Sequence, residues 1–211
     1  MPTRIKYPGN HLKNILRPPF FIFFLAISMT STAQRRALTY DVIRNGNKVG
    51  SIYFSETSSG KTDSLRLETT IRTKLISTFV VTAKEHAVFN NGILSESAIY
   101  RQLNGKEKAN KKHRSDNGKY VISGGKNSDG IKIYPITYNM LSLYSKEPLD
   151  IRKVYSDNFE SLLDIEKTED HKYKIALPDN SHNFYIYKEG VLSQVEVHHS
   201  LYSAKFVLVN K

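Results

Sequence analysis

The chain has 211 residues, with 31 Lys and Arg against 20 Asp and Glu, and it contains no cysteine. The lack of cysteine excludes disulfide bonds, cysteine-ligated metal centres and a bacterial lipoprotein anchor, so burial alone has to stabilise the fold. A chain of this size can bury about 70% of its unfolded surface, enough for one core. The net charge of +11 favours weak attraction to anionic surfaces without defining a partner.

Residues 1–33 have the features of a secretory signal peptide. Four basic residues precede the apolar run Phe20–Met29, and Ser31-Thr32-Ala33 supplies small residues suited to signal peptidase. The run is half of the about 20 apolar residues that a transmembrane helix needs. We therefore expect cleavage after Ala33, no membrane span in the remainder, and a single β-rich domain over 34–211, either in the periplasm or secreted. That remainder has 27 basic and 20 acidic residues, a net charge of +7.

Strand patterns and turn dipeptides fill the rest of the chain. Apolar and polar residues alternate clearly from Leu65 to Leu75, which predicts a strand with one buried and one wet face. Tight hairpin turns are predicted at four evenly spaced dipeptides: Asn91-Gly92, Asn104-Gly105, Asn117-Gly118 and Asp129-Gly130. With further strands before and after them, we predict a mainly β fold, an antiparallel meander of about ten to twelve strands curled into a barrel or half-barrel.

The strand Phe79–Phe89 places a carboxylate among apolar residues. Glu85 shares its face with Phe79, Val81, Ala83, Ala87 and Phe89. A three-residue loop at 90–92 would pair Phe89 with Ile93 and set Glu85 opposite Ser97, and we favour this register because it groups the apolar residues. Two interpretations remain: Glu85 orients a ligand or acts as a base in a small cavity, or a bulge or sheet edge lets it reach water.

The segment Lys106–Arg114 is the densest basic run. It could contact anionic lipid or glycan, but we expect a solvated hairpin whose lysines protect an exposed strand. It lacks the interleaved aromatic residues of a base-stacking surface, so nucleic acid is not an expected partner.

One short helix is predicted over about 136–147. Apolar residues recur there at helical spacing: Ile136, Met140, Leu141 and Tyr144. Thr137 could cap its start, and Pro135 and Pro148 bracket it. We expect this helix to pack on the concave face of the sheet or to plug a barrel mouth. The predicted cavity lining is therefore Phe79, Val81, Ala83, Glu85, Ser97, Met140, Leu141 and Tyr144.

No catalytic, metal or cofactor motif is found. His198 and His199 are adjacent on a predicted strand, so they point to opposite faces and do not share a metal ion readily. There is no helix with paired histidines and no nucleophile elbow. We therefore expect no catalytic residues, no metal and no cofactor.

Several short stretches resemble a family of exported proteins of unknown function from Bacteroidota-type bacteria. The likeness lies in Tyr40-Asp41-Val42, Asn45-Gly46, Lys48-Val49-Gly50, Tyr138–Pro148 and Tyr187–Leu192. The resemblance implies an antiparallel sheet curled around a helix, distantly similar in architecture to the periplasmic lipoprotein carriers of the Lol type. It implies no activity and no catalytic residues.

Three functional hypotheses follow. The leading one is an exported, non-catalytic envelope protein that binds an apolar or amphipathic molecule, such as a lipid or acyl chain, in the curled sheet. The first alternative is a structural or adaptor protein with a filled core that docks on another envelope protein. The second is a hydrolase of envelope polymers that uses Glu85 or Glu96, which we rank last because the favoured register places no second carboxylate beside Glu85.

Overall fold

Tight turns divide the chain into strands, as at Asn91-Gly92. Both residues have positive φ angles, 51° and 75°, and this pair of left-handed conformations defines the two-residue hairpin turn that matches the twist of its strands. The same pair of conformations recurs at 45–46, 104–105 and 189–190, so the predicted turns at 91–92 and 104–105 are confirmed. The predicted turns at 117–118 and 129–130 lie outside the described residues.

The structure, a computed structural model, describes residues 1, 3, 33–74, 78–116, 119–124 and 135–210. The elements in chain order are β1 Gln34–Arg44, β2 Asn47–Ser59, β3 Thr62–Lys74, β4 Thr78–Asn90, β5 Ile93–Leu103, β6 Lys106–Asp116, β7 Lys119–Ser123, α1 Ser142–Ser145, β8 Lys153–Ser156, β9 Ser161–Asp164, β10 Glu166–Glu169, β11 Lys172–Ala176, β12 His182–Lys188, β13 Val191–His199 and β14 Tyr202–Asn210. None of the described helices is long and apolar enough to span a membrane.

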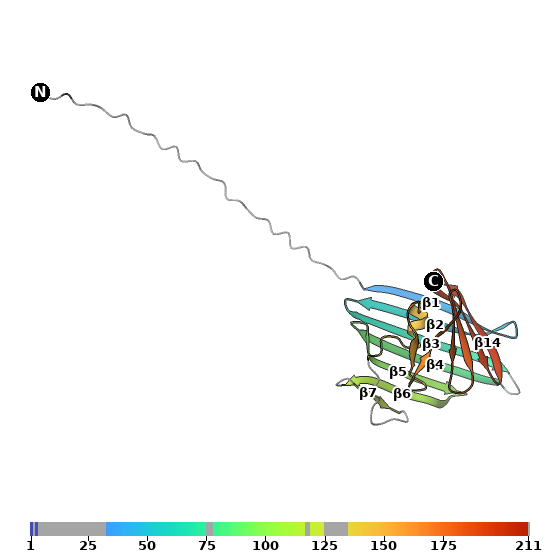
Figure 1. The fold of residues 1–211 in the computed structure, drawn as a ribbon. Helices are drawn as coiled ribbons and strands as arrows, with labels where there is room; N and C mark the ends of the chain where they lie inside the picture. The colour runs from blue at the N-terminus through green and yellow to red at the C-terminus, as the bar shows by residue number, and fades with distance from the viewer. Residues whose placement is uncertain (2, 4–32, 75–77, 117–118, 125–134, 211) are drawn as a thin grey trace. The chain divides into compact units, whose positions relative to one another are not determined.

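Twelve of these strands form one antiparallel sheet. Its order is β10-β11-β12-β13-β14-β1-β2-β3-β4-β5-β6-β7, so two meanders are joined where β14 pairs with β1. The sheet curls, and its two halves face each other (Figure 1). Within the described residues β7 and β10 remain edges, so the sheet is an open half-barrel. The predicted mainly β, antiparallel, curled fold is confirmed, with a strand number at the upper end of the expected range.

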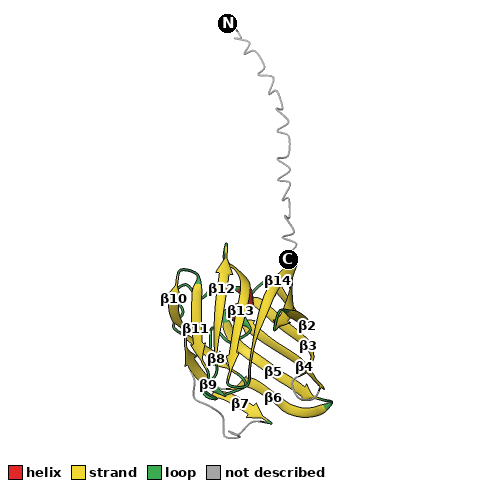
Figure 2. Ribbon diagram, turned by 90° about the vertical axis from the view of Figure 1, so that its right-hand side faces the viewer, coloured by secondary structure: helices red, strands yellow, loops and turns green. Residues whose placement is uncertain are grey.

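The concave face of the sheet is apolar and carries the core. Inward-facing residues such as Tyr40, Phe54 and Leu67 are buried, and they pack with the segment that follows β7. This segment contains α1 and the two-stranded sheet β8-β9, and it lies between the two halves of the main sheet (Figure 2). The Tyr144 ring stacks on Phe54 at 5.7 Å between centroids and meets Tyr40 edge-on at 5.5 Å, so α1 packs on the concave face as predicted.

The predicted helix over 136–147 is much shorter in the structure. Only Ser142–Ser145 is helical, and Thr137 is exposed and does not cap it. The first half is extended because β8 takes its backbone groups: Tyr155 N donates to Tyr138 O at 2.9 Å, and Met140 N donates to Tyr155 O at 3.0 Å. Pairing with β8 therefore replaces the expected first helical turns.

The helical turn begins at a side-chain bridge rather than at the predicted cap. The Asn139 Oδ1 atom accepts hydrogen bonds from the backbone N of Ser142 at 3.2 Å and from its hydroxyl at 3.1 Å. Such side-chain acceptors satisfy the first N–H groups of a helix, which have no partner inside it.

Candidate functional site

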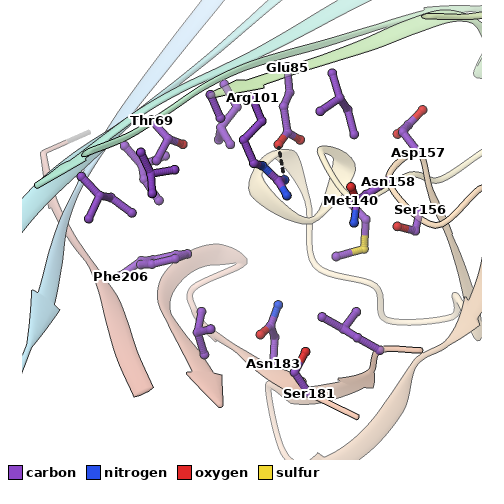
Figure 3. A pocket seen from close by; sticks show the side chains of 18 of the residues that line it. Thr69, Glu85, Arg101, Met140, Ser156, Asp157, Asn158, Ser181, Asn183 and Phe206 are labelled. Carbon is purple, nitrogen blue, oxygen red and sulfur yellow. Dashed lines mark hydrogen bonds and ion pairs between the residues drawn. The ribbon is translucent and has the colours of Figure 1, made fainter. Parts of the chain in front are cut away.

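A cavity of about 460 Å³ lies on the concave face, between strands β2–β6 and strands β12–β14 (Figure 3). We call it the sheet cavity. Its walls include Ile71, Val81 and Ile99 from the first half of the sheet and Tyr185, Val197 and Phe206 from the second. Its volume falls within the range of about 300–1,000 Å³ that is typical of small-molecule sites.

Short side chains leave this space open. Thr69 on β3 pairs with Ala83 on β4, and Ala83 pairs with Arg101 on β5, so a threonine and an alanine occupy the middle of the concave face. The neighbouring rows carry larger residues such as Leu67 and Ile71. Because Thr69 and Ala83 cannot reach the opposite strands, the two halves of the sheet do not fill the interior completely at this level.

Six of the eight residues predicted to line a cavity do so. They are Val81, Ala83, Glu85, Met140, Leu141 and Tyr144. Phe79 is half-buried near the start of β4 and lies outside the lining. Ser97 is buried but also lies outside it, because its side chain belongs to a hydrogen-bond network described below.

The predicted register of the β4–β5 hairpin is wrong. Asn90 pairs with Ile93 across a two-residue turn, and the register then shifts between Val88 and Phe89, so Ser95 is an extra, bulged residue. Its hydroxyl donates a hydrogen bond to Val88 O at 2.9 Å. As a result Glu85 faces Ile99 and not Ser97. The bulge turns the apolar residues of β5 to the concave face. The three-residue loop was predicted for the same reason, because it too would place these residues on that face.

The true register brings Glu85 beside Arg101. Ala83 faces Arg101 and Glu85 faces Ile99, so Glu85 and Arg101 are diagonal neighbours, and Arg101 Nη2 lies 3.5 Å from Glu85 Oε1. Both side chains reach into the sheet cavity (Figure 3), with 17% of the Glu85 and 38% of the Arg101 side chain exposed. Of the two interpretations of Glu85, the structure supports a carboxylate inside a cavity and not one at a sheet edge.

Burial dominates the electrostatics of Glu85. Desolvation raises the pKa of this carboxyl, because the charged form loses its water, and the nearby Asp157 carboxylate raises it further, while Arg101 opposes the shift. The phenols around the cavity respond in the same direction: burial raises the pKa of Tyr185 to about 12 and raises that of Tyr144 well above its ordinary value. The tyrosines are therefore neutral hydrogen-bonding groups at physiological pH.

The β4–β5 hairpin places no second carboxylate beside Glu85, but two from other segments, Asp157 and Asp179, also line the cavity. Asp157 Oδ1 accepts hydrogen bonds from the Ser97 hydroxyl and lies 3.2 Å from His113 Nδ1. Its Oδ2 accepts a hydrogen bond from Asn139 Nδ2 at 3.1 Å. Both oxygens are thus engaged by buried protein groups, which holds the segment after β8 against β5, β6 and the start of the α1 segment.

We expected the basic run Lys106–Arg114 to be solvated, and only part of it is. On β6 the side chains of Lys106, Lys108 and Lys112 are exposed, but Lys111 and His113 point inward. Lys111 Nζ lies 2.7 Å from Glu160 Oε1, whose side chain is 3% exposed. Period-two alternation with Ala109 could have placed Lys111 and His113 on the inner face, whereas their partners on residues 157–160 could not be found from spacing.

Glu96, the other carboxylate of the hydrolase hypothesis, lies on the outer face. It is half-exposed, and its Oε1 is 3.9 Å from His86 Nε2 across the hairpin. In the described ranges no group of three or more His, Cys, Asp or Glu side chains is placed to hold a metal ion.

Sequence comparison identifies the family. The family model described as "Domain of unknown function (DUF6134)" matches residues 40–209. The chain belongs to this family. The match covers the sheet from β1 to β14 and all residues of the sheet cavity, so the cavity lies within the domain that the family defines.

Comparison with solved structures supports the fold. The chain is similar to the β-barrel-like protein of domain of unknown function DUF1849 from Brucella abortus, with a TM-score of 0.52 and 10% sequence identity over 85% of this chain and 97% of that chain. At this identity the likeness concerns the fold alone. A search among curated proteins found no match.

Proposed function

We propose that this chain is an exported envelope protein that binds an apolar or amphipathic molecule in the sheet cavity without catalysing a reaction. The observation that carries the proposal is the cavity itself, about 460 Å³ on the concave face of the sheet. Apolar side chains from both halves of the sheet line part of it, and polar side chains such as Gln102, Ser156 and Asn183 line the rest. Removing an acyl chain from water against such walls contributes about 0.8 kcal/mol for each buried methylene group.

The features of residues 1–33 support export. We further propose that the protein works in a Bacteroidota-type cell envelope and that it resembles Lol-type lipoprotein carriers in architecture. The proposed partner is a lipid, not a nucleic acid. A non-catalytic role is favoured because both oxygens of Asp157 are engaged by buried protein groups, so this carboxylate is not free to assist Glu85 as an acid or base.

Filling the cavity tests the proposal. In the variant Ala83→Phe a phenyl ring would occupy the space above the short residues Thr69 and Ala83. The matched control is Ala98→Phe, because Ala98 lies on the same hairpin but on the face away from the cavity. Both variants are first checked for wild-type circular dichroism.

The readout is titration with the neutral fluorescent probe N-phenyl-1-naphthylamine. We expect the wild type and Ala98→Phe to bind the probe with similar affinity, and Ala83→Phe to bind it at least about tenfold more weakly, as expected for about 1.4 kcal/mol of lost binding energy. Equal binding by all three proteins, or no binding by the wild type, would refute the proposal.

A further inference from the structure

The only charged pair described within the apolar part of the sheet cavity is incompletely matched. Arg101 reaches Glu85 through a single Nη2–Oε1 contact at 3.5 Å, at the outer limit of a hydrogen bond. A guanidinium has five N–H donors and binds carboxylates best through two short parallel bonds. With 38% of its side chain exposed and one hydrogen bond to Glu85, Arg101 keeps further N–H donors for a ligand of the cavity that it lines.

The surroundings of Glu85 do little to stabilise its charged form. The groups that face it are Arg101 from β5, Asp157 from the segment after β8, Tyr144 from α1 and Tyr185 from β12. Of these only Arg101 stabilises the Glu85 anion by charge, whereas burial and Asp157 disfavour it and raise its pKa. If another anion replaced Glu85 at Arg101, the Glu85 carboxylate would lose its stabilising cation. It would then gain a proton readily.

We propose that the ligand of the sheet cavity is a single-chain amphiphile with an acidic head group, whose anion binds the Arg101 guanidinium in place of Glu85. The proposal rests on the proposed function and adds the ligand class to it. The apolar walls receive the chain, and a volume of about 460 Å³ suits one chain better than a complete two-chain phospholipid. The cavity lining also contains Lys108, whose side chain is exposed, and two further carboxylates. Those carboxylates, Asp157 and Asp179, accept hydrogen bonds from protein groups, so Arg101 is the site at which an anion would bind.

Binding of the anion is coupled to uptake of one proton. When the head group sits at Arg101, Glu85 takes a proton from solvent and its carboxyl O–H donates a hydrogen bond to the bound anion. Without that proton two carboxylates would share the site and repel each other. Affinity for an acidic amphiphile therefore falls as the pH rises, whereas affinity for a neutral amphiphile of the same chain length does not.

The experiment compares laurate with dodecanol, each displacing N-phenyl-1-naphthylamine from the full chain. At pH 6 laurate should displace the probe at about tenfold lower concentration than dodecanol, the effect expected of one charge-assisted hydrogen bond. Arg101→Gln should remove this preference, because it weakens displacement by laurate far more than displacement by dodecanol, and Arg101→Lys should restore part of it. Arg72→Gln, at an exposed arginine of β3, is the matched control and should behave as the wild type.

Glu85→Gln tests the proton. Between pH 6 and pH 8 the wild type should lose affinity for laurate, and Glu85→Gln should bind laurate equally at both values. Three results would overturn the proposal. They are equal displacement of the probe by laurate and dodecanol, an equal loss of affinity for both ligands in Arg101→Gln, and an affinity of the wild type for laurate that does not change with pH. In each of these outcomes the probe still binds, so the proposed function would stand; absence of probe binding would refute the proposed function as well.

Discussion

At the scale of single residues, Glu85 shows how burial sets the state of a charge. Because burial raises the pKa of Glu85 in the folded protein above its unfolded value, the protonated form is the one that the fold favours. The contribution of Glu85 to stability is therefore fully present below its unfolded pKa, about 4.3, and is lost as the pH rises through the folded pKa.

The substitution Glu85→Gln should expose this dependence in the free protein. The free energy of unfolding of the wild type, measured by urea denaturation, should fall relative to that of Glu85→Gln as the pH is raised from 4 to 8. The neutral glutamine does not titrate, so the difference between the two proteins isolates Glu85. A difference that stays constant over this range would show that burial does not disfavour the Glu85 anion.

Asp157 is the residue whose loss should cost most. Asp157→Ala leaves the Ser97 hydroxyl and the Asn139 amide without their buried acceptor, and it leaves His113 Nδ1 with the Tyr155 hydroxyl as its remaining partner. We expect the free energy of unfolding to drop by about 3 kcal/mol. Asp164→Ala, which removes a carboxylate with 82% of its side chain exposed, is the control and should leave stability unchanged. A small effect of Asp157→Ala would mean that the network does not hold the interior segment.

At the scale of elements, the bulge at Ser95 decides which residues of β5 enter the cavity. Side chains alternate along a strand, so a shift of one residue turns Ile99 and Arg101 to the outer face. Deleting Ser95 would remove only the extra residue, because Val88 would still pair with Glu96. Ile99 and Arg101 would keep facing the cavity, and we expect the deletion variant to unfold cooperatively in urea, close to the wild type. Ser95→Ala keeps the extra residue and loses one hydrogen bond to Val88 O, so it should cost only about 1 kcal/mol. Loss of cooperative unfolding in the deletion variant would contradict the register described above.

The same hairpin shows what the sequence could and could not predict. Asn91-Gly92 predicted the turn because few other residues adopt two successive positive φ angles. The bulge was missed because a three-residue loop restores the same apolar pairing. The β12–β13 hairpin repeats the feature, since Ser193 is bulged there and its hydroxyl donates to Ile186 O at 2.9 Å. The error placed Ser97 in the cavity and hid the pairing of Glu85 with Arg101.

Contacts between distant segments were the least predictable part of the site. Tyr144 and Met140 were predicted to lie at the concave face from their apolar spacing alone. The ties of Asp157 to Ser97 and His113 join residues 60 and 44 positions apart, and no local pattern reports such pairs. The length of α1 was overestimated for a related reason, because backbone bonds to Tyr155 hold 138–140 in an extended form.

At the scale of the whole domain, the interior contains a tightly packed region and a cavity. The segment with α1 and β8-β9 fills one part of the concave face with buried residues such as Leu143, Val154 and Tyr155. The sheet cavity occupies another part, where Thr69 and Ala83 are short. Composition and periodicity predicted the curled sheet, but they could not predict this division, because it depends on the register of every strand.

The proposed function requires that the cavity is occupied in the cell. The most direct measurement is native mass spectrometry of the wild type and Ala83→Phe, each produced with its residues 1–33 and purified from its own cell envelope under identical conditions. We predict that the wild type carries the added mass of one single-chain amphiphile and that Ala83→Phe does not. Recovery of both proteins at the bare polypeptide mass, or of the same adduct on both, would contradict the account.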